Sequence, residues 1–118
     1  MKTIYIAGPM RGIPRFNFDA FDRVRDELVA AGWTVISPAD LDREHGFDVD
    51  GLADDAADWW RPESLGFDLA AAIDRCLDAI AQCDAVYVLP GWRDSRGASA
   101  EVAVAKWRGL EIVFAPDR

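Results

Sequence analysis

The sequence predicts one α/β domain, built on a parallel sheet with helices on both faces. Short apolar runs rich in β-branched residues alternate along the chain with longer segments whose apolar residues recur at helical spacing. An alternating strand and helix order is typical of a doubly wound, Rossmann- or flavodoxin-like fold, and we expect four to five strands. The 118 residues, 51% of them hydrophobic, suit a single core, so we predict one domain over 1–118.

The first third of the chain predicts two strands around one helix. Lys2–Ala7 alternates and is β-branched, which is typical of a strand. Asn17 is expected to cap a helix that Gly32 ends. Trp33–Ile36 predicts a second strand, which Pro38 stops. The inward face of the helix is expected to carry Phe18, Phe21, Val24 and Leu28.

The last half predicts two more helices and two more strands. Phe67–Gln82 has helical spacing and Asp84–Leu89 follows it as the third strand. A helix over about Ala98–Arg108 stops at Gly109, and Leu110–Phe114 makes the fourth strand. The inward residues of the first of these helices are expected to be Leu69, Ile73, Leu77 and Ile80.

An acidic and irregular segment lies between these two halves, at about 39–66. It is longer than most connections in compact domains, and loops of this length often serve functional sites. We interpret it as a loop insertion, with two alternatives. It is either a lid over a site or a solvated insertion that Trp59 and Trp60 pin to the body or to a partner subunit.

Charge and composition limit the partners. A net charge of -8 and a pI near 4.5 argue against binding a nucleic acid polymer or an anionic membrane. No apolar stretch approaches the ~20 residues that span a bilayer, and the N-terminus enters a strand without a signal-peptide pattern. Cys76 and Cys83 lie outside any C-x-x-C motif, and His45 is the only histidine, so no zinc site is expected. We therefore expect a cytoplasmic protein with a small-molecule partner.

Two glycine-containing loops leave the ends of the predicted first and third strands. One begins at Gly8 and contains Arg11 and Gly12, and the other runs from Gly91 to Glu101. In a doubly wound sheet, ligands bind outside the carboxyl ends of the strands that flank the switch in strand order. The two loops therefore predict a small-molecule pocket between them.

Glu101 is the strongest candidate for chemistry. We expect it in the first turn of the third helix, where backbone N–H groups and the helix dipole favour an ionised, nucleophilic carboxylate. A capping box would need Ser or Thr at Ala98, so the remaining structural alternative is a surface glutamate. Ser95 and Gly97 would suit an anion cradle at the start of the helix, although ordinary turn residues look the same.

Two residues of the first strand and loop have open alternatives as well. Arg11, between two glycines, fits a guanidinium that reaches a phosphate, and is equally compatible with an exposed loop arginine. Tyr5 lies near the carboxyl end of the first strand, where it either serves the pocket or packs beneath a helix.

These residues occur in two motifs, I-Y-I-A-G-P-M-R-G and L-P-G-W-x-D-S-R-G-A-x-x-E. On them the chain resembles the nucleoside 2-deoxyribosyltransferase superfamily, especially its small phage and bacterial branch, over nearly its whole length. The superfamily includes deoxynucleoside 5′-monophosphate N-glycosidases. By position, the first loop of that family matches Tyr5, Gly8, Met10, Arg11 and Gly12, and the second matches Ser95, Gly97 and Glu101.

The resemblance implies roles for these positions. Glu101 would attack C1′ of the sugar and Tyr5 would be a second catalytic residue, while Arg11 and Ser95 would hold a 5′-phosphate. Retaining transfer through a sugar–carboxylate intermediate needs no metal and no organic cofactor. Relatives usually carry an Asp eight residues before the Asp of the C-D-A motif, to help protonate the leaving base, and this chain has Cys76 there. Its neighbours Asp74 and Asp78 are expected to point away from the inward helix face, so a residue of the 39–66 loop is the alternative proton donor.

Three functional hypotheses follow. The first is an N-glycosidase or deoxyribosyltransferase acting on a (deoxy)nucleoside 5′-monophosphate. The second, motivated by Cys76, is a non-catalytic nucleotide-binding module. The third is an interaction subunit that uses the five tryptophans and the acidic surface. Because family members commonly complete their site across an interface, the resemblance also implies a homodimer or a larger homo-oligomer.

Overall fold

A four-stranded parallel sheet is the centre of the structure, which is a computed structural model that describes residues 2–49 and 67–116. Its strands are β1 (Thr3–Ala7), β2 (Thr34–Ile36), β3 (Ala85–Val88) and β4 (Glu111–Phe114), in the order β2-β1-β3-β4. Every neighbouring pair is parallel. The predicted α/β fold is confirmed, with strand bounds within one or two residues of those expected.

The switch in strand order lies between β1 and β3, as the sequence predicts. From β1 the chain moves outward to β2 on one side and then returns to β3 and β4 on the other. Ala7 and Val88, the last residues of the two central strands, are partners in register. The carboxyl ends of β1 and β3 therefore lie next to each other at the same edge of the sheet.

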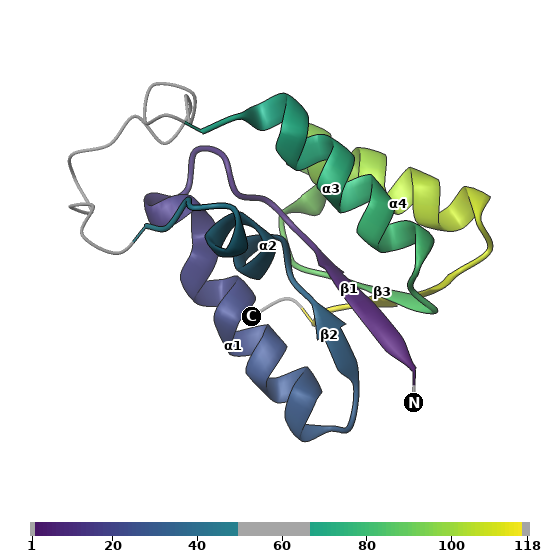
Figure 1. Ribbon diagram of the computed structural model, residues 1–118. Coiled ribbons are helices and arrows are strands. Elements are labelled where there is room, and N and C mark those ends of the chain that lie inside the picture. Colours follow the sequence, from purple (N-terminus) through teal and green to yellow (C-terminus); the bar gives the residue numbers. More distant parts are fainter. Residues whose placement is uncertain (1, 50–66, 117–118) are drawn as a thin grey trace.

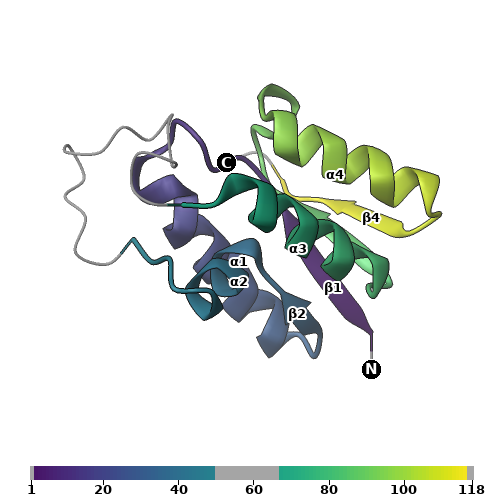
Figure 2. The same cartoon turned by 45° about the horizontal axis from the view of Figure 1, so that its top comes forward.

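Four α-helices cover the sheet: α1 (Phe18–Ala30), α2 (Pro38–Glu44), α3 (Leu69–Ala81) and α4 (Arg96–Trp107). Two short 3-10 helices, η1 (Pro14–Asn17) and η3 (Trp92–Asp94), precede α1 and α4. Figures 1 and 2 show α3 and α4 side by side on one face and α1 on the other. The helix α2 lies beside α1 and contacts α3 as well.

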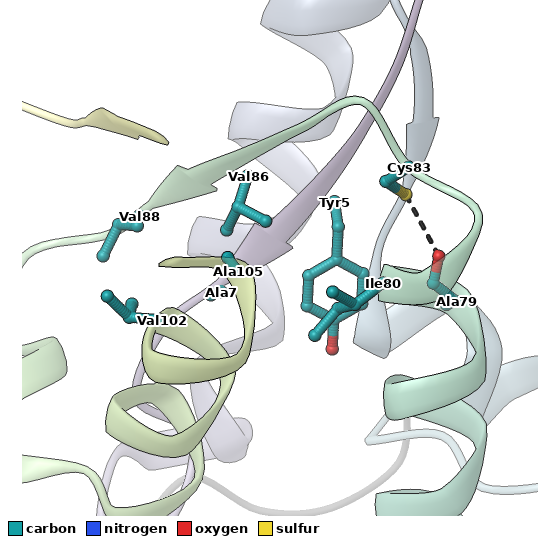
Figure 3. Packing of buried hydrophobic residues seen from close by; sticks show 9 residues of the cluster. All are labelled: Tyr5, Ala7, Ala79, Ile80, Cys83, Val86, Val88, Val102 and Ala105. Atoms are coloured by element: carbon teal, nitrogen blue, oxygen red, sulfur yellow. Dashed lines mark hydrogen bonds between the residues drawn. The ribbon is translucent and has the colours of Figure 1, made fainter. Parts of the chain in front are cut away.

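Successive side chains of β1 point to opposite faces of the sheet, and the core accordingly consists of two clusters, one on each face. Tyr5 and Ala7 face α3 and α4, whereas Ile6 packs with the phenylalanines of α1. We call the first the α3–α4 cluster; Figure 3 shows it from close by. The residues expected inward on α1 are confirmed, because Phe18, Phe21 and Val24 are buried and Leu28 packs against them.

The helix α2 was not predicted. Pro38 was expected only to stop β2, but it occupies the first helical turn, where its missing N–H and fixed φ are well tolerated. The segment that the sequence presents as an irregular insertion therefore begins as a helix. Its remainder over 50–66, including Trp59, Trp60 and the proposed lid, lies outside the described residues.

The prediction for the inward face of α3 was wrong at two positions. Ile73 is 50% exposed and Leu77 is 39% exposed, while Ile80 is buried as expected. The helix instead turns the small residues Ala72 and Ala79 to the interior. Since α3 is apolar on more than one side, its spacing fits two faces, and close packing against the sheet favours the face with small side chains. Asp74 and Asp78 are exposed, as expected.

The helix α4 begins at Arg96, two residues earlier than predicted. Ser95 is its N-cap, with Oγ accepting a hydrogen bond from the N–H of Ala98 at 3.2 Å. Glu101 is consequently the sixth residue of the helix and not part of its first turn. The expected stabilisation of its charge by free N–H groups at the helix start is therefore wrong.

Candidate functional site

Tyr5 and Glu101 are joined by a hydrogen bond on the side of the sheet that α3 and α4 cover. The hydroxyl of Tyr5 donates to Oε2 of Glu101 at 2.5 Å, joining residues 96 positions apart in the sequence. Tyr5 is fully buried. Figure 3 shows its ring reaching away from β1, beside Ile80, with the hydroxyl pointing away from the strand. The structure thus unites the two residues that the resemblance makes catalytic.

Local structure explains this meeting. Tyr5 pairs with Ile36 and Val86 in the strands on either side, so its direction is fixed by the pleat of the sheet. On α4, Ala98, Val102 and Ala105 form the buried face. Glu101 lies three residues after the first of these and four before the last, at the edge of the same face. The helix therefore carries a carboxylate to the margin of the α3–α4 cluster.

Burial dominates the electrostatics of Glu101. It raises the pKa of the carboxyl to about 7, although hydrogen bonds with Tyr5 and Cys76 act in the opposite direction. Burial, followed by the negative charge of Glu101, raises the pKa of Tyr5 well above its usual value, so this hydroxyl keeps its proton and remains a donor. No ion pair within the described part of the chain joins Glu101 to a cation. A carboxylate poised near neutral pH suits proton transfer or nucleophilic attack.

Cys76 brings a third group to the same place. It lies half-buried on α3 and packs against the α3–α4 cluster. Burial, with the charge of Glu101 second, raises the pKa of its thiol to about 12. The thiol is therefore neutral at physiological pH. The position where the resemblance leads us to expect an acid therefore holds a weaker acid, on which the charge of Glu101 acts.

A carboxylate of α2 is also buried. Asp42 on α2 is 5% exposed, and its Oδ1 lies 3.4 Å from Nη2 of Arg75 on α3. Burial raises the pKa of Asp42 to about 6, with Arg75 opposing that shift most strongly. Nε of Arg75 and Oγ of Ser37 are buried without a hydrogen-bond partner in the described residues. The sequence analysis did not predict the pairing of Asp42 with Arg75.

The first loop is tightly built around its glycines. A Cβ on Gly8 would lie 2.7 Å from Cβ of Leu89, so only glycine lets the ends of β1 and β3 approach this closely. Gly12 has a φ of 83°. The chain then makes three successive left-handed residues, which end at Asn17. Asn17 occupies the N-cap position of α1 but does not cap it; its Nδ2 donates to the carbonyl of Pro9 at 2.9 Å.

The second loop is held by hydroxyl groups at both ends of its turn. Ser95 caps α4, and Oγ of Ser99 donates to the carbonyl of Trp92 at 3.0 Å. A Cβ on Gly97 would meet no atom within 4 Å, so packing of the described residues does not require glycine there. The open backbone at this position is accessible to a ligand.

The predicted residues do not all share one surface. Tyr5, Gly8, Ser95, Gly97 and Glu101 belong to the ends of β1 and β3 and to the helix that follows β3. Met10, by contrast, packs against the cluster on the α1 side, and Arg11 is exposed. Within residues 2–49 and 67–116, no group of three potential metal ligands is gathered.

This combination defines a Rossmann-like parallel α/β domain with a tyrosine–carboxylate pair at its topological switch point. The chain belongs to the family described as a domain of unknown function (DUF4406), whose pattern matches residues 2–53 and 56–114. The sequence matches none of the curated proteins with which it was compared. None of the helices formed by the described residues has the length and apolar character that a membrane span requires.

Proposed function

We propose that the protein cleaves the N-glycosidic bond of a (deoxy)nucleoside 5′-monophosphate, as an N-glycosidase or a deoxyribosyltransferase of the nucleoside 2-deoxyribosyltransferase-like superfamily. The observation that carries this proposal is the partly buried hydrogen bond between Tyr5 and Glu101. It joins the two sequence motifs on which the resemblance rests. It also supplies part of the arrangement that glycosyl transfer requires, a carboxylate held through one of its two oxygens.

Glu101 is the nucleophile in this proposal. Tyr5 donates to Oε2, which fixes the carboxylate and leaves Oε1 to attack C1′. The transition state is cationic at the sugar, and a desolvated carboxylate stabilises such a charge more strongly than an exposed one does. The product of the first step is a sugar ester of Glu101, which water or a second base then resolves.

The two loops supply the contacts to the 5′-phosphate. Oγ of Ser95 uses a lone pair to cap α4, so its hydroxyl proton remains available to a phosphate oxygen. The open backbone at Gly97 lies at the start of that helix, where N–H groups and the dipole favour an anion. Arg11, exposed on the first loop, would close over the phosphate from the other side.

The test is chromatography of free bases after incubation with a panel of nucleosides and their 5′-monophosphates. Wild type is expected to release bases from monophosphates, and Glu101→Gln, which keeps the shape and loses the charge, to lose at least ~10³-fold. Ser95→Ala is expected to raise KM for monophosphates more than it lowers kcat. Base release that survives in Glu101→Gln would refute the proposal.

A non-catalytic nucleotide-binding module is the second candidate, favoured by Cys76 in the place of the expected acid. It predicts calorimetric binding of a monophosphate with no product. It also predicts that Glu101→Gln binds as well as wild type. Tight binding without any base release would move the conclusion to this candidate.

A homodimer or larger homo-oligomer remains a prediction. Several large apolar side chains are exposed on the described surface, namely Val29, Ile73, Leu77, Trp107 and Phe114. Exposed apolar side chains such as these are compatible with a partner surface. Light scattering at working concentration checks the prediction, and a monomer there would count against it.

A further inference from the structure

A pocket of about 290 Å³ lies on the opposite side of the sheet from Tyr5 and Glu101, and the proposed reaction makes no use of it. It is bounded by α1 and by the segments that follow β1, β3 and β4 at the carboxyl edge of the sheet. We call it the α1 pocket. Its lining residues Tyr87 and Leu89 pack with the cluster on the α1 side, whereas Tyr5 belongs to the α3–α4 cluster.

The walls of the α1 pocket are held by hydrogen bonds that tie its segments together. Asn17, which precedes α1, donates from Nδ2 to the carbonyl of Pro9 at 2.9 Å. The N–H of Leu89 donates to the last carbonyl of β1, and the N–H of Ala115 donates to the last carbonyl of β3, both at 2.8 Å. The pocket is therefore pre-formed, and a ligand can enter it without reordering the chain.

The walls suit a flat ring. Most of the lining side chains are apolar, and they include the rigid rings of Pro9, Pro90 and Pro116 and the aromatic ring of Tyr87. Small-molecule sites are typically apolar pockets with a few polar groups, and nucleobases in particular stack on the rings of tyrosine and other flat side chains. The rigid lining therefore favours a planar heteroaromatic ligand over a flexible chain.

Two charged side chains of opposite sign line the same pocket. Arg23 and Glu27 lie on successive turns of α1, and both are exposed. Among the described residues, neither side chain takes part in an ion pair or a hydrogen bond. A cation one turn before a glutamate is the less favourable order for an ion pair within a helix, so both groups are available to a ligand. A ligand here meets a donor and an acceptor side by side, which favours a neutral molecule over an anion or a cation.

We propose that the α1 pocket binds a neutral purine base of the guanine type, an inference that goes beyond the proposed function and does not depend on it. Along one edge, guanine carries two neighbouring N–H donors, on N1 and N2, followed by two acceptors, O6 and N7. The carboxylate of Glu27 accepts from the donors, and the guanidinium of Arg23 donates to the acceptors. Adenine would place its N1 acceptor against the carboxylate, so the pocket distinguishes the two bases.

The first test uses 9-ethylguanine, which keeps this edge of guanine but has no sugar or phosphate and therefore cannot be a substrate. Binding is followed by nuclear magnetic resonance of labelled methyl groups. Val24 and Leu89 report on the α1 pocket, and Ile80 and Val102 report on the α3–α4 cluster. We expect saturable shifts at Val24 and Leu89. No binding, or shifts confined to Ile80 and Val102, would overturn the proposal and leave the proposed function intact.

The second test removes each charge in turn. Arg23→Met and Glu27→Gln are each expected to weaken the binding of 9-ethylguanine on the order of 10-fold. Both side chains are exposed, so neither change threatens folding. Asp26→Asn, on the same helix but outside the pocket, is the matched control and should leave binding unchanged. Undiminished binding in both Arg23→Met and Glu27→Gln would overturn the assignment of the two charges.

The third test compares ligands on the wild-type protein by calorimetry. We expect 9-ethyladenine to bind at least ~10-fold more weakly than 9-ethylguanine, because its edge has a different order of donors and acceptors. Free phenylalanine, a zwitterion with a flat ring, should also bind more weakly. Equal binding of the two bases would overturn the assigned edge, and tighter binding of phenylalanine would overturn the assignment of the pocket to a base.

Discussion

The two sides of the sheet treat charged groups in opposite ways. Between α1 and α2, Arg25 lies 2.6 Å from Asp40, and Arg43 lies 2.7 Å from Asp22, all of them partly exposed. On the α3–α4 side, Glu101 is largely desolvated, and among the described residues its carboxylate accepts a hydrogen bond from the hydroxyl of Tyr5. The first arrangement pairs each of these four charges with an opposite one, and the second leaves Glu101 without a cation among the residues that the structure describes.

The difference distinguishes charges that hold a helix in place from a charge to which we assign a chemical role. Partly exposed ion pairs contribute little free energy each, so the arginine–aspartate network mainly holds the short helix α2 against α1. A buried carboxylate without a cation costs free energy whenever it is ionised, and it is kept where the charge has a use. We therefore interpret the α3–α4 side as the working side of the molecule.

The largest expected effect comes from the point where the two central strands converge. Gly8→Ala places a Cβ against Leu89 and is expected to lower the free energy of unfolding by about 1–3 kcal/mol, measured by urea denaturation. Gly97→Ala is the matched control, because a Cβ there meets nothing within 4 Å. It should change stability by less than ~1 kcal/mol. Equal losses in both variants would contradict the close approach of the strands.

The next largest expected effect concerns the pKa of Glu101. Tyr5→Phe removes a donor that lowers the pKa of Glu101, so this pKa should rise further above about 7. Because the ionised form attacks, base release at pH 7 should fall ~10-fold and recover partly at higher pH. The pH profile of kcat in the two proteins checks this. A profile that does not move would separate Tyr5 from Glu101 functionally.

The smallest expected effect concerns the ion pairs between α1 and α2. Arg43→Met keeps most of the side chain and removes the charge that faces Asp22 and Asp40, so unfolding should cost about 0.5–1 kcal/mol less. The loss should shrink in 1 M salt, where such pairs are screened. Base release should be unchanged. A large loss of activity in Arg43→Met would contradict our interpretation that the charges between α1 and α2 take no part in the chemistry.

Sequence alone predicted the parallel sheet and its switch point, because strand and helix periodicities are local and their alternation implies a parallel sheet. The roles of Tyr5 and Glu101 stay predictions. Sequence reasoning placed Glu101 in the wrong turn, since the start of α4 depends on one hydroxyl of Ser95 that accepts from Ala98. It also chose Ile73 and Leu77 as inward residues, because spacing cannot rank two apolar faces when tight packing prefers alanine.

The pair of Asp42 and Arg75 was beyond sequence reasoning for a different reason. The two residues lie 33 positions apart, on a helix that was not predicted and a helix whose face was predicted in part. Only the packing of α2 against α3 brings them together. Long-range contacts between buried polar side chains have no local signature, whereas the motif residues do.

The most direct test of the account is the free energy of unfolding of wild type and Glu101→Gln as a function of pH. The pKa of Glu101 is raised from its ordinary value near 4.5 to about 7 in the folded protein. The folded state therefore holds this proton more tightly, and the resulting stability is complete below pH 4.5 and lost as pH rises through 7. Asp42 titrates in both proteins and cancels in the difference. We predict equal stability near pH 4 and an advantage of Glu101→Gln on the order of 1–3 kcal/mol at pH 8. An advantage that does not grow with pH would contradict a desolvated carboxylate at the centre of the site.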